Sequence, residues 1–261
     1  MNKKILVLQH VEWAGPGRLL LDAVPRPEAG FHVVRLWEQA APDPADFDAL
    51  ILLGGPMVTG DRTQRALVSE VKRLLQAWLS LDRPCLGFNL GHLLLADAFR
   101  ARTGANFMSG IGFQKAHLTH DGRNHPLFHG IASPLLLFKW HDQAIQMPAP
   151  ADMVLLATSS HCVVEAFSIK GRPSIIGLQC DNYAAHPDDV ARWIAGCGSV
   201  PSLALPEHAS ARKLVDQAGR HLAEMRQTFT KLIKNFITLT DNQPLPRGTK
   251  DMTSATDEPP P

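Results

Sequence analysis

The chain has 261 residues, of which 45% are hydrophobic and 20% charged, a balance typical of a soluble globular protein with one large domain or one domain plus an appendage. Its formal net charge of +1 comes from 26 basic and 25 acidic residues without a long basic run, so nucleic acid is not an expected partner. No stretch approaches the roughly 18 apolar residues of a membrane span, and the apolar run at residues 5–8 is too short for a signal-peptide core, which predicts a cytoplasmic protein.

The first hundred residues alternate short apolar runs with helical patterns, which predicts βαβ units and a parallel sheet. We expect strands at residues 4–8, 32–37, 49–55 and 83–88. We expect helices at residues 17–24, 63–80 and 93–100, and a Pro- and Asp-rich loop at residues 40–46.

Between residues 104 and 179 the apolar runs are shorter and are broken by Gly and Pro. Strands are expected at residues 111–119, 135–140, 153–158, 162–169 and 174–180. Some of them should be antiparallel, because their connections are too short for helical crossovers. The expected fold is therefore α/β: a doubly wound, mainly parallel sheet with helices on both faces and a smaller antiparallel extension.

The C-terminal part predicts a short helix at residues 187–194 and a long amphipathic helix at residues 207–238, whose apolar stripe should pack on the domain. Residues 241–261 are polar and rich in Pro, which predicts a disordered tail. Residues 1–198 are accordingly expected to form the main domain.

The sharpest local signal is the stretch Gly87-Phe88-Asn89-Leu90-Gly91, which follows a predicted strand and precedes a helix. This is the layout of a nucleophile elbow, whose central residue has strained backbone angles and points into the crevice above the sheet. The same spacing also fits an ordinary tight turn between a strand and a helix. Asn tolerates positive φ well, so we expect a positive φ at Asn89.

The stretch resembles the P-x-L-G-x-C-x-G-x-Q segment of class I glutamine amidotransferases. Four other stretches resemble segments of the same family in the same order: Leu53-Gly54-Gly55-Pro56, Ile111-Gly112-Phe113, Trp140-His141-Asp142 and Gly177-Leu178-Gln179. The stretch His125-Pro126-Leu127-Phe128 resembles the family's D-P-L-F. The resemblance runs from about residue 4 to residue 194 and is strongest to stand-alone members similar to the amidotransferase domain of GMP synthase. It implies a flavodoxin-like class I amidotransferase fold.

That family hydrolyses glutamine through a cysteine thioester, with a His as base and a Glu that orients the His. Position by position, the resemblance places Asn89 at the nucleophile, Asp181 at the base and Tyr183 at the orienting residue. The Gln that helps to hold substrate is replaced by Leu93. All three catalytic positions and one substrate contact are thus altered together, which makes the thioester mechanism implausible.

The resemblance further implies that Gly55, Leu90, Leu93 and His141 line the oxyanion hole or pocket. The twelve histidines show no metal-binding spacing, and no metal or cofactor is expected. Cys85 and Cys180 are candidate replacement nucleophiles, but both are expected to be buried or to face away from the site. His186 imitates a catalytic His but is expected to begin a helix.

The leading hypothesis is a degenerate amidotransferase-like protein that binds a small ligand or a partner synthase. The alternatives are an enzyme of different chemistry in the same crevice, with Asp181 and Tyr183 as acid and base, or an amidotransferase with an unrecognised nucleophile. The sequence does not define an oligomeric state. Two further expectations follow: Asp181 should titrate as an ordinary carboxyl with a pKa near 3.9, and Asn89→Gly should be neutral or stabilising.

Overall fold

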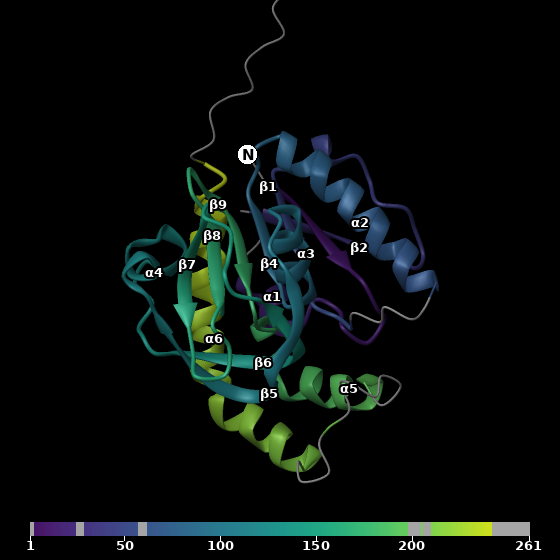
Figure 1. Cartoon of the computed structure of the whole chain (residues 1–261). Helices are drawn as coiled ribbons and strands as arrows, with labels where there is room; N and C mark the ends of the chain where they lie inside the picture. Colours follow the sequence, from purple (N-terminus) through teal and green to yellow (C-terminus); the bar gives the residue numbers. More distant parts are fainter. Residues whose placement is uncertain (1–2, 25–28, 57–61, 198–204, 206–209, 242–261) are drawn as a thin grey trace, which may run out of the picture.

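A computed structural model describes residues 3–24, 29–56, 62–197, 205 and 210–241 (Figure 1). Its strands are β1 (Lys3–Gln9), β2 (Ala29–Arg35), β3 (Ala49–Leu52), β4 (Cys85–Phe88), β5 (Thr103–Leu118), β6 (Leu135–Ile145), β7 (Met153–Thr158), β8 (Ala166–Ile169) and β9 (Arg172–Leu178). Its α-helices are α1 (Arg18–Ala23), α2 (Arg62–Ser80), α3 (Leu90–Ala98), α4 (His120–Asn124), α5 (Pro187–Cys197) and α6 (Ala211–Thr238), with short 3₁₀ turns η1 (Pro44–Asp46), η2 (Pro126–Phe128) and η3 (Asn182–Ala184).

The strands form one sheet in the order β2-β1-β3-β4-β9-β8-β7-β5-β6. Strands β2, β1, β3, β4 and β9 pair in parallel, and β8, β7, β5 and β6 continue the sheet with antiparallel pairs. The mainly parallel sheet with a smaller antiparallel extension is therefore confirmed.

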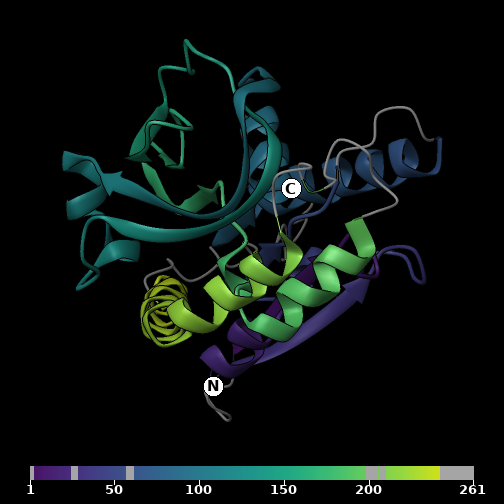
Figure 2. The same cartoon turned by 90° about the horizontal axis from the view of Figure 1, so that it is seen from below.

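Helices cover both faces of the parallel half because its strands are apolar on both sides. Along β1, Ile5 and Val7 belong to the core under α1, α5 and α6, whereas Leu6 and Leu8 belong to the core under α2 and α3. Figure 2 shows α5 and α6 (green to yellow-green) on one side of the molecule and α2 (blue) on the other. None of the described helices is long and apolar enough to cross a membrane.

The helix predicted at residues 207–238 is observed from Ala211 to Thr238 as α6, which packs against α1 and α5 through its apolar stripe; residues 207–209 lie outside the described residues. Of the tail predicted at residues 241–261, only Asp241 is described, in the turn that follows α6, and residues 242–261 lie outside the described residues.

One predicted strand was wrong over part of its length. Residues 162–165 lie in irregular, bent backbone, and β8 begins only at Ala166. The Ser159 hydroxyl accepts hydrogen bonds from the backbone N–H groups of His161 and Cys162, both at 3.1 Å, so these two groups are satisfied without strand pairing.

Candidate functional site

Asn89 stands between β4 and α3 with φ 45° and ψ −102°, so the predicted positive φ is confirmed. Its backbone N–H donates to the Leu178 carbonyl at 2.9 Å. Both flanking glycines are required by close packing. A Cβ on Gly87 would lie 2.5 Å from the Gly91 carbonyl oxygen, and a Cβ on Gly91 would lie 2.5 Å from Leu52 Cβ. The stretch therefore folds as the elbow that its glycine spacing predicts.

The Asn89 side chain joins two other elements by hydrogen bonds. Its Nδ2 donates to Asp181 Oδ2 at 2.8 Å and to the Trp140 carbonyl at 2.9 Å. Its Oδ1 accepts a longer hydrogen bond from Gln179 Nε2 at 3.3 Å. The elbow is thus bonded both to the end of β9 and to β6, the edge strand of the extension.

Tyr183 extends this network towards β3. Its hydroxyl donates to Asp181 Oδ1 at 3.1 Å and accepts from the Gly54 backbone N–H at 2.9 Å. The three positions that the resemblance aligns with the triad therefore lie in one chain of hydrogen bonds, in the order Tyr183, Asp181, Asn89.

The network is sealed from solvent: Asn89 is 5% exposed, and Asp181 and Tyr183 are both 0% exposed. Burial raises the pKa of Asp181 to about 7, although hydrogen bonds from Asn89 and Tyr183 act in the opposite direction. The sequence-based expectation of an ordinary carboxyl pKa was therefore wrong, because the burial of residue 181 was not foreseen. Burial and the nearby Asp181 charge also raise the pKa of Tyr183 well above its usual value.

The expected pocket residues surround the elbow but are mostly closed. Leu90 and Leu93 are 2% and 3% exposed, whereas Gly55 is partly exposed with φ 154°. His141 is buried on β6, and its Nδ1 bonds to the Gln143 carbonyl at 3.0 Å rather than to any triad position. Burial lowers the pKa of His141 to about 3, so its imidazole is neutral.

The other candidate catalytic residues, Cys85, Cys180 and His186, take no part in the side-chain hydrogen bonds of this network. All four cysteines are free and buried, and burial raises the pKa of each thiol, so the reactive thiolate form is suppressed. His186 Nδ1 accepts from the Asp188 backbone N–H at 3.2 Å, as expected for a residue that begins α5. Among the described residues, no group of three or more His, Cys, Asp or Glu side chains could hold a metal ion.

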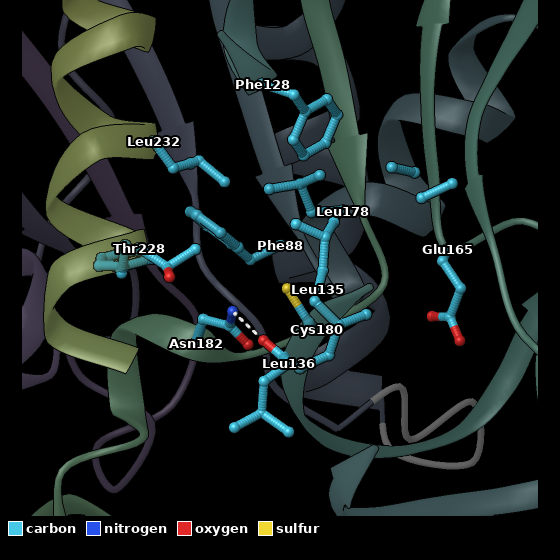
Figure 3. Close-up of a pocket in the computed structure, with 14 residues that line it drawn as sticks. Phe88, Phe128, Leu135, Leu136, Glu165, Leu178, Cys180, Asn182, Thr228 and Leu232 are labelled. Carbon is cyan, nitrogen blue, oxygen red and sulfur yellow. Dashed lines mark hydrogen bonds between the residues drawn. The ribbon is translucent and has the colours of Figure 1, made fainter. Parts of the chain in front are cut away.

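Figure 3 shows a cavity between α6 and the sheet that is separate from this network. Apolar side chains such as Phe88, Leu178 and Leu232 form most of its lining, together with the Cys180 thiol. Its volume is about 20 Å³, which suits a single water molecule rather than a substrate.

Sequence reasoning missed a buried ion pair close to the elbow. Lys139 Nζ lies 2.5 Å from Glu165 Oε1, and the two side chains are 0% and 1% exposed. Ser159 Oγ donates to the same oxygen at 2.5 Å. The Lys139 charge contributes to the lowered pKa values of His92 and His141. The sequence does not predict this ion pair, because the two residues are 26 positions apart and meet only through the register of the folded sheet.

Solved structures share this architecture. A glutamine amidotransferase from Thermotoga maritima superposes with a TM-score of 0.78 over 91% of this chain and 99% of that chain, at 19% identity. A glutamine amidotransferase from Methylobacillus flagellatus superposes with a TM-score of 0.74 over 98% and 100%, at 22% identity. These similarities define the class of fold.

The sequence defines the family. Residues 19–189 match the family described as Glutamine amidotransferase class-I, and the chain belongs to this family. The glutamine amidotransferase-like protein YfeJ of Salmonella typhimurium is 26% identical over 197 residues, which cover 72% of this chain and 74% of YfeJ. A subunit of the glutamine-hydrolysing GMP synthase of Archaeoglobus fulgidus is 30% identical over 135 residues, 51% of this chain and 65% of that protein.

The hydrogen bonds of Asn89 reverse the expectation for Asn89→Gly. Glycine would relieve roughly 1 kcal/mol of backbone strain, but it would remove one buried hydrogen-bond donor from Asp181 Oδ2 and one from the Trp140 carbonyl. We expect Asn89→Gly to lower the free energy of unfolding by about 2 kcal/mol in urea titrations. Asn89→Ala loses the same bonds but keeps the strain, so it should be lower still by about 1 kcal/mol. A neutral Asn89→Gly would contradict a stabilising role for these bonds.

Proposed function

We propose that this chain is a class I amidotransferase relative that does not hydrolyse glutamine and acts instead by binding a partner protein or a small ligand. The observation that supports this proposal most is the buried network of Asn89, Asp181 and Tyr183. It occupies the three positions at which the resemblance places the catalytic triad.

The groups in the network cannot carry out thioester chemistry. The Asn89 amide nitrogen is a poor nucleophile, because its lone pair is delocalised into the carbonyl, and it already donates two hydrogen bonds. In the glycine turn that contains the expected oxyanion-hole residue Gly55, the neighbouring Gly54 N–H is bonded to the Tyr183 hydroxyl, so this donor is not free to stabilise an oxyanion. The groups that catalysis would need are therefore engaged in holding the fold together.

A binding role agrees with the relatives. The relative from Archaeoglobus fulgidus is named as one subunit of a glutamine-hydrolysing GMP synthase. A family member that has lost hydrolysis can keep a role in an assembly of this kind, because docking depends on the surface rather than on the elbow.

We expect no glutamine hydrolysis above background. With no nucleophile at residue 89, neither ammonia nor glutamate should be released, and a diazo or chloroketone glutamine analogue should not label the protein there. Coupled glutamate detection with purified protein measures this, and the glutamine-hydrolysing GMP synthase of Archaeoglobus fulgidus serves as the positive control. Activity that disappears in Asn89→Ala would overturn the proposal.

We also expect that Asn89→Cys alone will not restore hydrolysis. The new thiol would face Asp181, whose negative charge disfavours a neighbouring thiolate, whereas a His becomes positively charged and favours it. Tyr183 would still occupy the Gly54 N–H. Iodoacetamide labelling across pH measures the reactivity of the thiol, and turnover of glutamine by this variant would refute the explanation.

The pKa of Asp181 favours a second candidate, an enzyme that uses Asp181 as a general acid or base. A carboxyl that titrates near pH 7 suits proton transfer at neutral pH. Its 0% exposure means that a substrate would reach it only after the site opens. An activity that is lost in Asp181→Asn but kept in Asn89→Ala would distinguish this enzyme from a binding protein.

A further inference from the structure

Three segments at one end of the β5–β6 ribbon contain no Asp, Glu, Lys or Arg, although such residues make up 20% of the chain. These segments, residues 103–111, 143–150 and 159–164, are together called the uncharged strip. Four large apolar side chains in the strip are exposed: Phe107 (64%), Met108 (48%), Met147 (53%) and Val163 (41%). Figure 1 shows β5 and β6 side by side in the lower half of the molecule.

Hydrogen bonds hold the strip together. Between Ala105 and Gly110 the β5–β6 register shifts, and Phe107 and Met108 lie within this irregularity. Asn106 Nδ2 donates to the carbonyls of Met108 at 2.7 Å and His161 at 2.8 Å, so it ties the irregular part of β5 to the segment that carries Val163. The backbone that carries Phe107 and Met108 is therefore held in place by hydrogen bonds.

Two arginines flank the strip. Arg100 and Arg102 line a surface groove of about 520 Å³ that also includes Pro148 and Asp152. Arg102 Nη2 donates to the Met147 carbonyl at 3.3 Å, which places one guanidinium directly beside the strip. Neither arginine forms an ion pair with a carboxylate in the described part of the chain.

We propose that the uncharged strip, with Arg100 and Arg102, is a docking face for a partner protein whose surface is apolar and bears acidic side chains at its rim. Phe, Met and Arg are enriched in protein interfaces, and Lys, Glu and Asp are depleted there. Complementary acidic groups on the partner would neutralise the two guanidinium groups. This inference rests on the proposed binding function, and it states where on the surface the partner binds.

A second copy of this chain fits the face less well. In a two-fold dimer each surface patch meets itself, so four arginines would be brought to the same small interface, and the groove offers only Asp152 from each copy to match them. A different chain with acidic residues avoids this repulsion.

The docking face is also linked to the buried network through β6. The same strand supplies the Trp140 carbonyl that accepts from Asn89 and ends two residues before Met147. Gly110, at the end of the irregular segment of β5, pairs with His141. A partner on the strip would thus contact the ribbon that the network holds against the parallel sheet.

Site-specific photocrosslinking in cells of the source organism tests the proposal. The full chain would carry Phe107→benzoylphenylalanine, and the control would carry Leu21→benzoylphenylalanine, which replaces another exposed apolar side chain, on α1. We expect one protein adduct from position 107 that is absent from position 21. Adding Arg100→Glu and Arg102→Glu should reduce that adduct by about tenfold or more, whereas Arg100→Lys and Arg102→Lys should largely keep it. Acid-to-lysine changes in the adducted protein should restore crosslinking to the glutamate variant.

Three outcomes would overturn the docking face: no adduct at position 107, an adduct between two copies of this chain, or an adduct that the arginine changes leave unaltered. Circular dichroism of each variant checks that it is folded, since all of these positions lie at the surface. Glutaminase assays on the same variants are independent of crosslinking, so a failure of the docking face can be told apart from a failure of the proposed loss of hydrolysis.

Discussion

Asp181→Asn should become more stable relative to the wild type as the pH rises from 4 to 8, by on the order of 4 kcal/mol in total. The folded pKa of Asp181 is about 7, above the value of about 3.9 expected in the unfolded chain. The wild type therefore holds this proton more tightly when folded, and the resulting stability is complete below pH 4 and is lost as the pH rises through 7. In the variant an amide replaces the Asp181 carboxyl and carries no charge at any pH. The variant therefore does not lose this stability as the pH rises.

The comparison must use the difference between the two proteins at each pH. Burial lowers the pKa values of His10, His92 and His141 to about 4, 3 and 3, so both proteins lose stability as the pH falls below about 6.5. These contributions cancel in the difference. Urea titrations from pH 4 to pH 8 measure it, with Asp216→Asn as a control at an exposed carboxyl. A difference that stays flat with pH would show that Asp181 ionises normally in the folded chain.

The elbow could be predicted from the sequence because its determinants are local. Gly87 and Gly91, on either side of Asn89, allow β4, α3 and β3 to approach closely. The need for both glycines can be read from the five residues 87–91 alone. The positive φ at Asn89 followed from the same spacing. The apolar runs similarly predicted the parallel half of the sheet, since strands that are buried on both faces need no polar alternation.

The partners of Asn89 could not be predicted in the same way. The residues that bond to the Asn89 side chain lie 51, 90 and 92 positions away in the sequence. Two of the groups in the network are backbone atoms, of Trp140 and Gly54, so the identity of these residues does not reveal the bond. The raised pKa of Asp181 depends on complete burial, a property of the assembled sheet. For this reason the sequence alone predicts a neutral or stabilising Asn89→Gly, whereas the hydrogen bonds of Asn89 predict a destabilising one.

The positions aligned with the triad now connect three parts of the fold. Tyr183 bonds to the turn after β3, Asp181 follows β9, and Asn89 reaches across to β6. A catalytic triad must expose its nucleophile to substrate, whereas these side chains are buried and satisfy one another. The three side chains are therefore mutually consistent as a structural unit, because each residue supplies the donor or acceptor that its neighbour needs.

Gly54→Ala should strongly destabilise this unit, with a loss in free energy of unfolding on the order of 4 kcal/mol. A Cβ on Gly54 would lie 2.1 Å from Asp181 Oδ1 and 2.9 Å from the Tyr183 hydroxyl. Real Cβ atoms do not approach oxygen so closely, and both side chains are fully buried, so neither can swing into solvent. The methyl group must therefore displace Asp181 and break its bonds to Asn89 and Tyr183.

Gly30→Ala is the matched control, because a Cβ on Gly30 in β2 would meet nothing within 4 Å. It should change stability by less than about 0.5 kcal/mol. Thermal and urea unfolding of both variants provide the comparison. The Gly54→Ala protein should also lose the pH-dependent difference that Asp181→Asn reveals, because a displaced Asp181 is no longer buried between Asn89 and Tyr183. If Gly54→Ala were as stable as Gly30→Ala, Asp181 would have to move without cost, and the network would not be the rigid unit that its hydrogen bonds indicate.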